Sequence, residues 1–372
     1  MSSDGRSYEL TRLAFKDLEG WAQDDPSCLL DAMMDCRTYL TSVKPYRTGE
    51  LGLTSDDLLY LLNAASALES RDPKAVRAFF ERECVPFRIT RKDGGSGFVT
   101  GFFEPEVDVA ETADEQFRFP FYRRPGDLVD LDDDTRPSQI DRSYVFARST
   151  AAGIDLYPDR KAIDQGYLDS KGLEIAWARS KVEVFFAHVQ GAARLRYADG
   201  RQVRITYAAK AGHAFSPIGR LLIDRGAIPA TEISMQTIRD WLVSNPDQAD
   251  EVLWHNRSYI FFREAAVEDP SKGPIAAAKV PLLAGRSLAV DRSIHTFGFP
   301  FFIRSASLTH LDGGRAFARL MLALDTGSAI VGPARGDIFT GSGYDAGEQA
   351  GIIRNDAEFT LLIPWRAAAR FL

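Results

Sequence analysis

From about residue 84 onward, the chain consists of short apolar segments broken by glycine and proline. The segments at 87–90 (FRIT), 97–105 (GFVTGFFEP) and 117–125 (FRFPFYRRP) are rich in aromatic and β-branched residues, which is typical of strands. The same texture returns over residues 278–363. Short strands between glycine-rich turns, with few crossover helices, favour barrels over a doubly wound sheet. The sequence therefore predicts a mainly β protein.

Residues 1–90 have a different, helical pattern. Ser55 is expected to cap a helix whose first turn carries two aspartates, where negative charge suits the helix dipole. The pair Asp72-Pro73 is expected to open another helix, because proline is favoured at the first helical position. Helices are therefore expected ahead of the β-rich part.

The segment between the two β-rich stretches is mixed. A short helix is expected over 158–164, and Ser234 is expected to cap an amphipathic helix over 235–243. A hairpin turn is expected at Asp199-Gly200, and a linker over 269–274. The strand-like segments here are 181–189 (KVEVFFAHV), 193–200, 202–210 and 255–264.

Length and charge limit the classes of function. A chain of 372 residues with 45% apolar residues suggests two domains, or one domain with a large insertion. The net charge of −7 disfavours nucleic acid and anionic membrane surfaces as partners. No apolar run reaches transmembrane length, and the start MSSDGRSYEL shows neither a signal pattern nor a lipid-attachment cysteine.

No metal or other cofactor is expected. The three cysteines (Cys28, Cys36 and Cys84) form no C-x-x-C pair, and the five histidines form no H-E-x-x-H motif. A Cys36–Cys84 disulfide remains open if the chain is exported; the plainer interpretation is small buried apolar side chains. His213 is the one histidine in a motif-like context, as a structural or substrate contact.

Three aspartates near the C-terminus are the strongest chemical signal. They are Asp291 (SLAVDRSI), Asp325 (ALDTGSAI) and Asp337 (ARGDIF). Each adjoins a short apolar run, so short strands would bring three carboxylates together, where they alter each other's proton affinity. That arrangement suits acid and base chemistry. Taken singly, Asp337 could cap a turn, Asp325 could form an Asx-turn, and Asp291 could pair with Arg286 or Arg292.

The segment TGFFEP (100–105) has two interpretations. Adjacent aromatic residues usually pack in a core. A Thr-Gly pair before two phenylalanines and an acid could instead line a groove, since sugar rings stack on aromatic faces and take hydrogen bonds from a few polar anchors. Tyr207, Tyr259 and Trp254 could add to such a groove.

These segments match a known family. The matching blocks are TGFFEP (100–105), YAAKAGHAFSPIGRLLIDRG (207–226), SMQTIRDWL (234–242), NRSYIFFRE (256–264), SLAVDRSI (287–294) and RLMLALDTGSAI (319–330) continuing to GDIFTG (336–341). Over about residues 98–351, the chain resembles the MltA-type lytic transglycosylases, membrane-bound enzymes that cut bacterial peptidoglycan. The last blocks resemble the module named for its three aspartates (the 3D domain).

The resemblance implies a fold. It implies a double-psi β-barrel, split in sequence, with a second β-barrel-like domain inserted and a groove between them. The expected catalytic part is 1–106 plus 271–372, with N-terminal helices and the three-aspartate module over about 280–351. The expected inserted, glycan-binding part is 107–270.

The resemblance also implies residue roles. The family's catalytic aspartate falls on Asp337 and the supporting one on Asp325, while Asp291 is expected to brace the barrel. The residues expected to bind glycan are Thr100, Gly101, Phe102, Phe103, Glu104, Gln190, Tyr207, His213, Ser216, Gln236 and Tyr259. Two departures stand out: the family usually has tyrosines where this chain has Phe102 and Phe103, and a small polar residue is missing after VQG (189–191).

The implied activity is cleavage of the β-1,4 bond between N-acetylmuramic acid and N-acetylglucosamine, with a 1,6-anhydromuramyl product. Asp337 alone is expected to act as acid and then as base, since the muramyl C6 hydroxyl is the nucleophile. Two alternatives stay open: an inverting peptidoglycan or β-glucan hydrolase using Asp325 with Asp337, and a non-catalytic wall-binding protein. The enzyme class expected is an exotransglycosylase. The sequence itself is equally compatible with cleavage at the ends of glycan strands and with cleavage inside them.

The resemblance extends to partners and location. The expected partners are peptidoglycan glycan strands and a wall-synthesis or division complex, with the protein itself a monomer. The expected location is the periplasm, with association to the outer membrane.

Overall fold

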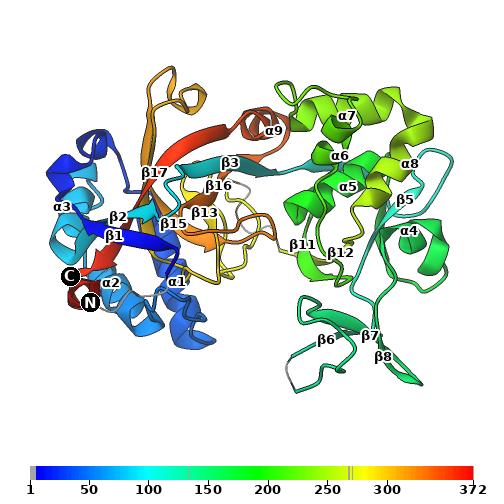
Figure 1. The fold of residues 1–372 in the computed structure, drawn as a ribbon, viewed down its shortest axis with the longest axis horizontal. Coiled ribbons are helices and arrows are strands. Elements are labelled where there is room, and N and C mark those ends of the chain that lie inside the picture. Colours follow the sequence, from blue (N-terminus) through cyan, green and yellow to red (C-terminus); the bar gives the residue numbers. More distant parts are fainter. Residues whose placement is uncertain (1–5, 133, 267–268, 270, 372) are drawn as a thin grey trace. The chain divides into compact units, whose positions relative to one another are not determined.

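The computed structural model describes residues 6–132, 134–266, 269 and 271–371. The chain divides into two compact units (Figure 1). The first unit comprises Met1–Phe103, Ser271–Gly341 and Asp345–Leu372, and the inserted unit comprises Glu104–Pro270 with Ser342–Tyr344. Residue 270 of the expected linker lies outside the described residues.

The first unit is organised around one sheet of eight strands, in the order β1-β2-β17-β14-β15-β13-β16-β3. The strands are β1 (Tyr8–Arg12), β2 (Cys84–Arg91), β3 (Gly97–Glu104), β13 (Ser287–Val290), β14 (Pro300–Ser305), β15 (Phe317–Asp325), β16 (Arg335–Ser342) and β17 (Arg354–Pro364). Because β17 also pairs with β3, the strands from β17 to β3 close into a six-stranded barrel, and β2 and β1 extend from β17 as a flanking ribbon. The expectation of a mainly β protein is confirmed.

The barrel encloses the largest apolar core of the chain. The middle strands are buried over most of their length; Phe301, Leu320 and Leu322, for example, are 0% exposed. Each such side chain contributes about 1.5–3 kcal/mol relative to an exposed one. Burial on both faces therefore explains why these segments read as continuous apolar runs in the sequence.

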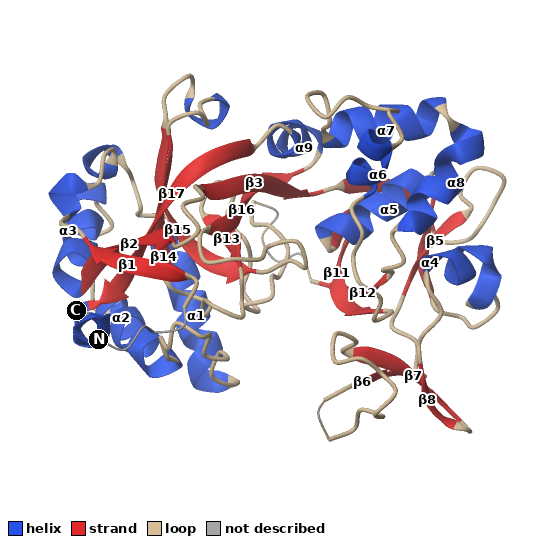
Figure 2. Ribbon diagram, in the orientation of Figure 1, coloured by secondary structure: helices blue, strands red, loops and turns tan. Residues whose placement is uncertain are grey.

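Helices pack around the barrel within the first unit (Figure 2). They are α1 (Leu29–Ser42), α2 (Ser55–Ser66), α3 (Pro73–Glu83), α9 (Tyr344–Gly351) and α10 (Trp365–Ala368). Asp72 caps α3 and Pro73 is its first residue, as expected. The expected cap of α2 is wrong by one residue: Thr54 accepts from the Asp57 N–H, whereas the Ser55 hydroxyl donates to the Tyr46 carbonyl at 3.1 Å.

The three cysteines are free thiols. Cys36 and Cys84 are buried, and burial raises the pKa of both thiols, that of Cys36 to about 12. The structure therefore contains no Cys36–Cys84 disulfide, and both side chains pack as small apolar groups.

The inserted unit contains a sheet of six strands, in the order β12-β11-β10-β4-β9-β5. These strands are β4 (Glu106–Ala110), β5 (Phe119–Tyr122), β9 (Glu174–Ala178), β10 (Ala192–Tyr197), β11 (Gln202–Lys210) and β12 (Ile260–Ala265). An isolated bridge between Arg123 and Phe262 brings the two edges of this sheet together. A smaller sheet consists of β6 (Leu128–Asp130), β7 (Phe146–Thr150) and β8 (Gly153–Asp155).

Most helices of the inserted unit form a second layer with its own apolar cluster (Figure 2). The helices are α4 (Arg160–Ala162), α5 (Lys181–Gln190), α6 (Ile218–Asp224), α7 (Met235–Ser244) and α8 (Pro246–His255). Ser234 caps α7, and the Asp199-Gly200 turn joins β10 to β11, both as expected. The short helix expected over 158–164 is present as α4 and a following turn over Ile163–Tyr167.

The segment 181–189 is helix α5, so the strand expected there is wrong. The Ser180 side chain accepts from the Val182 N–H, and Gly191 ends the helix with φ of 75°. Val184 packs against the sheet core, and Phe185 packs into the helical cluster. Because the helix is buried on two sides, its sequence lacks the polar stripe that distinguishes a helix from a buried strand.

Candidate active site

Asp325 and Asp337 lie on the two strands that flank β13. Ala289 of β13 is in register with Asp325 of β15 on one side and with Asp337 of β16 on the other. Residues directly opposite each other in a sheet point to the same face, and neighbouring strands are about 4.8 Å apart. The two carboxylates therefore share one face, with their Cα atoms about 10 Å apart across a single small side chain.

An irregularity in β15 produces this register. Leu288 pairs with Ala323, but the next residue, Ala289, pairs with Asp325, so Leu324 is an extra residue in the strand. Leu324 is buried, and the bulge turns Asp325 to the face that Ala289 and Asp337 share. Bulges commonly aim side chains at the rims of barrels in this way.

Thr100 contacts Asp337 directly, although the two residues lie 237 positions apart in the chain. The Thr100 hydroxyl donates to Oδ1 of Asp337 at 2.5 Å. Nη2 of Arg335 donates to Oγ1 of Thr100 at 2.7 Å, and Nη1 donates to the Gly336 carbonyl. The sheet places β3 beside β16, so barrel closure brings the TGFFEP segment to the aspartate.

Asp325 is held by backbone groups. Its Oδ1 accepts from the Ala277 N–H at 3.1 Å, and the Thr326 hydroxyl donates to the Val290 carbonyl at 2.9 Å. Lys279, in the same turn as Ala277, has a left-handed φ of 65°, which is strained for a residue other than glycine. Its side chain is exposed, and its charge acts on Asp325.

Burial raises the pKa of both carboxyls to about 6. For Asp337, the hydrogen bond from Thr100 and the charge of Arg335 oppose this rise. For Asp325, the N–H groups of Thr326 and Ala277 oppose the rise, while the charge of Asp337 adds to it. Carboxyls with a pKa near the working pH can both release and recover a proton, which is the requirement for acid and base catalysis.

Asp291 has a different environment from the other two aspartates. It is 8% exposed, and its oxygens accept from the Ser293 N–H, the Ser293 hydroxyl and the Gly332 N–H at 2.9, 2.6 and 2.7 Å. These bonds tie the end of β13 to the loop before β16, which is a bracing arrangement. The ion pair considered with Arg286 is not formed, because Arg286 pairs with Asp24 at 2.8 Å.

The middle of the TGFFEP segment serves packing. Phe102 and Phe103 are 9% and 6% exposed, and the Phe102 ring lies 5.3 Å from that of Phe339. A side chain at Gly101 would come within 2.8 Å of the Ala350 backbone, so glycine allows β3 to approach α9 closely. These two phenylalanines therefore pack in the core, and neither ring offers a stacking face to a sugar.

Glu104 is an internal ion-pair partner within the inserted unit. It has no exposed surface, and its carboxylate accepts from Arg204 Nε at 2.6 Å and from Arg194 Nη2 at 3.3 Å. The Ser342 hydroxyl donates to it at 2.6 Å. All of these partners are protein groups, so the carboxylate is committed to the fold of this unit.

The other residues expected to bind glycan lie in the inserted unit. His213 and Tyr259 are each 2% exposed; His213 donates from Nε2 to the Tyr157 carbonyl at 2.7 Å, and burial lowers its pKa. Both side chains face the interior. Those with exposed surface are Gln190, Tyr207, Ser216 and Gln236.

Two site residues were missed from the sequence. Arg335 precedes Asp337 by two positions on β16, so its side chain leaves the same face of the strand. That spacing was a usable signal. Ala289 had no such signal, because its position between two aspartates depends on strand pairing.

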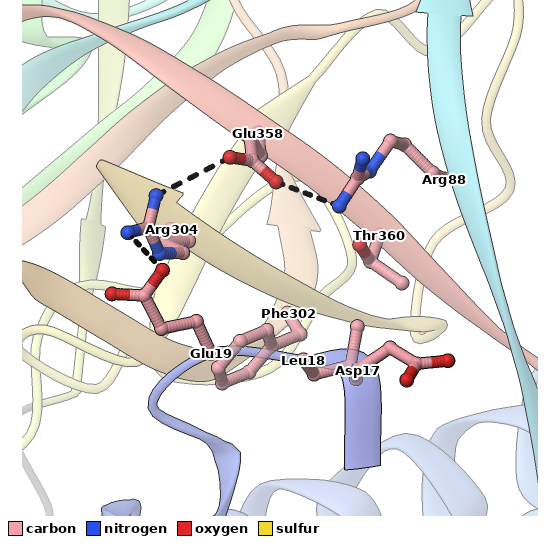
Figure 3. A pocket seen from close by; sticks show the side chains of 8 residues that line it. All are labelled: Asp17, Leu18, Glu19, Arg88, Phe302, Arg304, Glu358 and Thr360. Atoms are coloured by element: carbon pink, nitrogen blue, oxygen red, sulfur yellow. Dashed lines mark hydrogen bonds and ion pairs between the residues drawn. The ribbon is translucent and has the colours of Figure 1, made fainter. Parts of the chain in front are cut away.

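The first unit also has a hollow that is lined by residues outside the candidate site (Figure 3). It is lined by Asp17, Leu18, Glu19, Arg88, Phe302, Arg304, Glu358 and Thr360. Glu358 pairs with Arg88 at 3.0 Å and with Arg304 at 3.3 Å, and Arg304 also pairs with Glu19. These charges neutralise one another, and no candidate site residue lines the hollow.

The MltA specific insert domain matches residues 98–263, and the 3D domain matches residues 286–363. A crystal structure of membrane-bound lytic murein transglycosylase from Agrobacterium tumefaciens is 60% identical, with a TM-score of 0.94 over 98% of this chain and 100% of that one. The chain belongs to the MltA family of lytic murein transglycosylases.

Other MltA proteins are more distant. Membrane-bound lytic murein transglycosylase A of Vibrio cholerae is 32% identical over 290 residues, which cover 76% of this chain and 69% of that protein. A structure of Escherichia coli MltA with bound chitohexaose is 25% identical, with a TM-score of 0.65 over 98% of this chain and 97% of that one. MltA membership confirms the family expected from the motifs and the expectation of a peptidoglycan-cleaving enzyme. Within the described ranges, none of the helices combines the length and the apolar character that a membrane span requires.

Proposed function

We propose that this chain cleaves the β-1,4 bond between N-acetylmuramic acid and N-acetylglucosamine in peptidoglycan, leaving a 1,6-anhydromuramyl end. The observation that carries the proposal is the environment of Asp337. Its carboxyl has a pKa of about 6, accepts a hydrogen bond from Thr100 and shares a barrel face with Asp325. Membership of the MltA family supports the substrate class.

In the first step, protonated Asp337 gives its proton to the glycosidic oxygen as the bond to the muramyl C1 breaks. The N-acetylglucosamine leaves with that proton, and C1 gains oxocarbenium character. A carboxyl with a raised pKa suits this step, because a useful share of the molecules is protonated near neutral pH.

In the second step, the Asp337 carboxylate takes the proton of the muramyl C6 hydroxyl. The hydroxyl oxygen closes onto C1, which forms the 1,6-anhydro ring and returns Asp337 to its protonated form. No water is consumed. An internal nucleophile gains from proximity, so one carboxyl serves where an ordinary glycosidase needs two.

Asp325 acts as the supporting carboxyl in this proposal. Two like charges on one face disfavour each other's ionisation, and the charge of Asp337 contributes to the raised pKa of Asp325. Asp291 braces the end of β13 through its bonds to Ser293 and Gly332.

For glycan binding, we propose the residues with accessible surface: Thr100, Gly101, Gln190, Tyr207, Ser216 and Gln236. The buried residues Phe102, Phe103, Glu104, His213 and Tyr259 would act indirectly, by holding these positions. The chitohexaose bound to E. coli MltA supports a sugar-binding surface in this family.

We also propose the finer architecture implied by the family. The closed barrel would be a double-psi barrel formed by residues 1–106 and 271–372, with the three-aspartate module over about 280–351. Residues 107–270 would be the inserted glycan-binding part. A periplasmic location at the outer membrane accords with the name "membrane-bound" of its relatives.

An inverting hydrolase is the second candidate. Asp325 and Asp337 share one face of the barrel, and both carboxyls have raised pKa values, so they form the kind of acid and base pair that an inverting hydrolase uses. In that reaction water adds to C1 and a reducing end forms. The two functions therefore differ in the mass of the product.

Product analysis in ¹⁸O-labelled water tests the proposal. Purified sacculi digested by the wild type should release anhydromuropeptides that contain no ¹⁸O at C1. Asp337→Asn should bind sacculi but lose at least about 10³-fold in rate, the scale of removing a catalytic acid–base group. Reducing ends labelled with ¹⁸O would establish the hydrolase instead, and binding without any soluble product would establish a wall-binding protein.

A further inference from the structure

Thr100 stands between two charged groups of β16. Its hydroxyl oxygen is 2.7 Å from Nη2 of Arg335 and 2.5 Å from Oδ1 of Asp337. Arg335 is half-buried, and its ring partner Phe98 lies 5.6 Å from the guanidinium carbon. The three side chains therefore form a continuous chain from the arginine to the carboxyl.

The chemistry of the three groups gives this chain a direction. A guanidinium has only donors, so the Thr100 oxygen must accept from Arg335. The single hydroxyl proton of Thr100 then points at Asp337, whose Oδ1 accepts the hydrogen bond. Without Arg335, the hydroxyl could rotate and accept from a protonated Asp337 instead.

We propose that Arg335 is a positioning residue that acts on Asp337 through Thr100, holding the hydroxyl as a donor to Oδ1 and so leaving Oδ2 as the oxygen that carries the transferable proton. This inference rests on the proposed role of Asp337 as acid and base. The inference assigns a role to Arg335, which is not one of the three aspartates.

The arrangement accounts for both steps of the proposed reaction. While Asp337 is protonated, the donor at Oδ1 keeps the proton on Oδ2, ready for the glycosidic oxygen. After transfer, the same donor stabilises the carboxylate until it takes the C6 proton. Hydrogen bonds to the ionised form and nearby positive charge both lower the pKa of a carboxyl. Thr100 and Arg335 therefore oppose the rise that burial causes in the pKa of Asp337.

Other charged groups lie on the neighbouring strands and turns. Asp325 lies across β13, Lys279 lies in the turn beside Asp325, and Asp291 follows β13. On β17, Arg354 is in register with Thr100 and is exposed. Arg354 therefore offers a matched control, because it carries the same charge as Arg335 beside the same threonine.

The test is a double-mutant cycle of Arg335→Gln and Thr100→Val on soluble glycan strands. Each single change should lower kcat by about tenfold, and the double variant should lose about tenfold rather than about 100-fold. For Arg335→Gln, KM should change less than about threefold. The alkaline limb of the pH profile should move upward by about half a pH unit. Losses that multiply in the double variant would overturn the proposal.

A second readout does not need turnover. The Asp337 carboxyl carbon can be followed by NMR with ¹³C-labelled aspartate, its signal identified by its loss in Asp337→Asn. The rise in its titration midpoint caused by Arg335→Gln should be at least halved in the Thr100→Val background, since only the direct charge effect remains there. An equal rise in both backgrounds would refute the relay, whatever product the enzyme forms.

Conservative variants guard against loss of folding. Arg335→Lys and Thr100→Ser keep the donor and the hydroxyl, so both should retain the wild-type titration midpoint. Arg354→Gln should leave kcat within about twofold and the midpoint unmoved. If Arg354→Gln moved the midpoint as far as Arg335→Gln does, the loss of any nearby positive charge would explain the shift, and the hydrogen bonds through Thr100 would not.

Discussion

Asp325 and Asp337 face each other across one alanine. Ala289 is in register with both, from the parallel strand β15 and the antiparallel strand β16. One small side chain separates the two carboxylates, and β13 itself is buried. The pair therefore combines a short separation across the sheet with low solvation, which raises both pKa values.

A larger side chain between the two aspartates should stop the reaction. Ala289→Val adds two methyl groups between the aspartates and should lower kcat by at least about 100-fold, because reacting groups tolerate little displacement. Overpacking should also lower the free energy of unfolding by about 1–3 kcal/mol. Ala323→Val is the matched control, since Ala323 lies on β15 opposite Leu288 and is buried. Its kcat per folded molecule should stay within about threefold of wild type; comparable losses in both variants would show that stability alone is affected.

Asp337→Asn should stabilise the protein above pH 6. The pKa of Asp337 rises from 3.8 to about 6 on folding, so between these values the folded state holds a proton that the unfolded chain has released. Stability is then lost as pH rises through the folded pKa, and the neutral asparagine avoids that loss. Urea unfolding at pH 3.5, 5 and 7.5 should show a gain of about 1–2 kcal/mol for the variant at pH 7.5 and almost none at pH 3.5. A constant difference at all three values would contradict the raised pKa.

Glu104→Ala should unfold the inserted unit readily. The carboxylate is fully buried between Arg194 and Arg204, and its removal leaves buried positive charge without compensation. A loss of about 3–5 kcal/mol in unfolding free energy is expected. Glu106→Ala offers a comparison two residues further along the chain, because Glu106 pairs with Arg194 at 3.3 Å but is partly exposed. It should lose no more than about 1 kcal/mol; equal losses would show that burial of the pair is irrelevant.

Reducing agent should not change stability. The thiols of Cys36 and Cys84 are free and buried, so no disulfide constrains the unfolded chain. Thermal unfolding with and without dithiothreitol should give the same midpoint. A thiol titration should find three reactive groups in denaturant, with Cys28 the most accessible in the folded protein. A midpoint that drops on reduction would indicate a disulfide.

Local pattern predicted several features correctly. Asp72 caps α3, Ser234 caps α7, and Asp199-Gly200 turns between β10 and β11. Each of these depends on contacts within a few residues, where capping and turn geometry dominate. The same reasoning failed for α5, because burial on two sides removed the polar stripe that marks a helix.

For the candidate site, sequence patterns identified the acidic residues better than they predicted which side chains are exposed. Asp325 and Asp337 were proposed as a pair, and the barrel places them on one face. Glu104, His213 and Tyr259 were expected to contact sugar, yet all three are buried. Burial follows from residues far away in the chain, such as Arg204 for Glu104, which are 100 positions apart.

The sequence by itself determined the family, the strand-and-turn texture and the caps of α3 and α7, because these depend on short motifs and nearest neighbours. Only the tertiary structure decided which groups touch Asp337. Closure of β3 onto β17 and β16 brings Thr100 into contact with Asp337, which lies 237 positions away in the chain. The extra residue Leu324 turns Asp325 to the face that it shares with Asp337. Strand pairing and bulges are set by how the whole barrel packs, so no local pattern reports them.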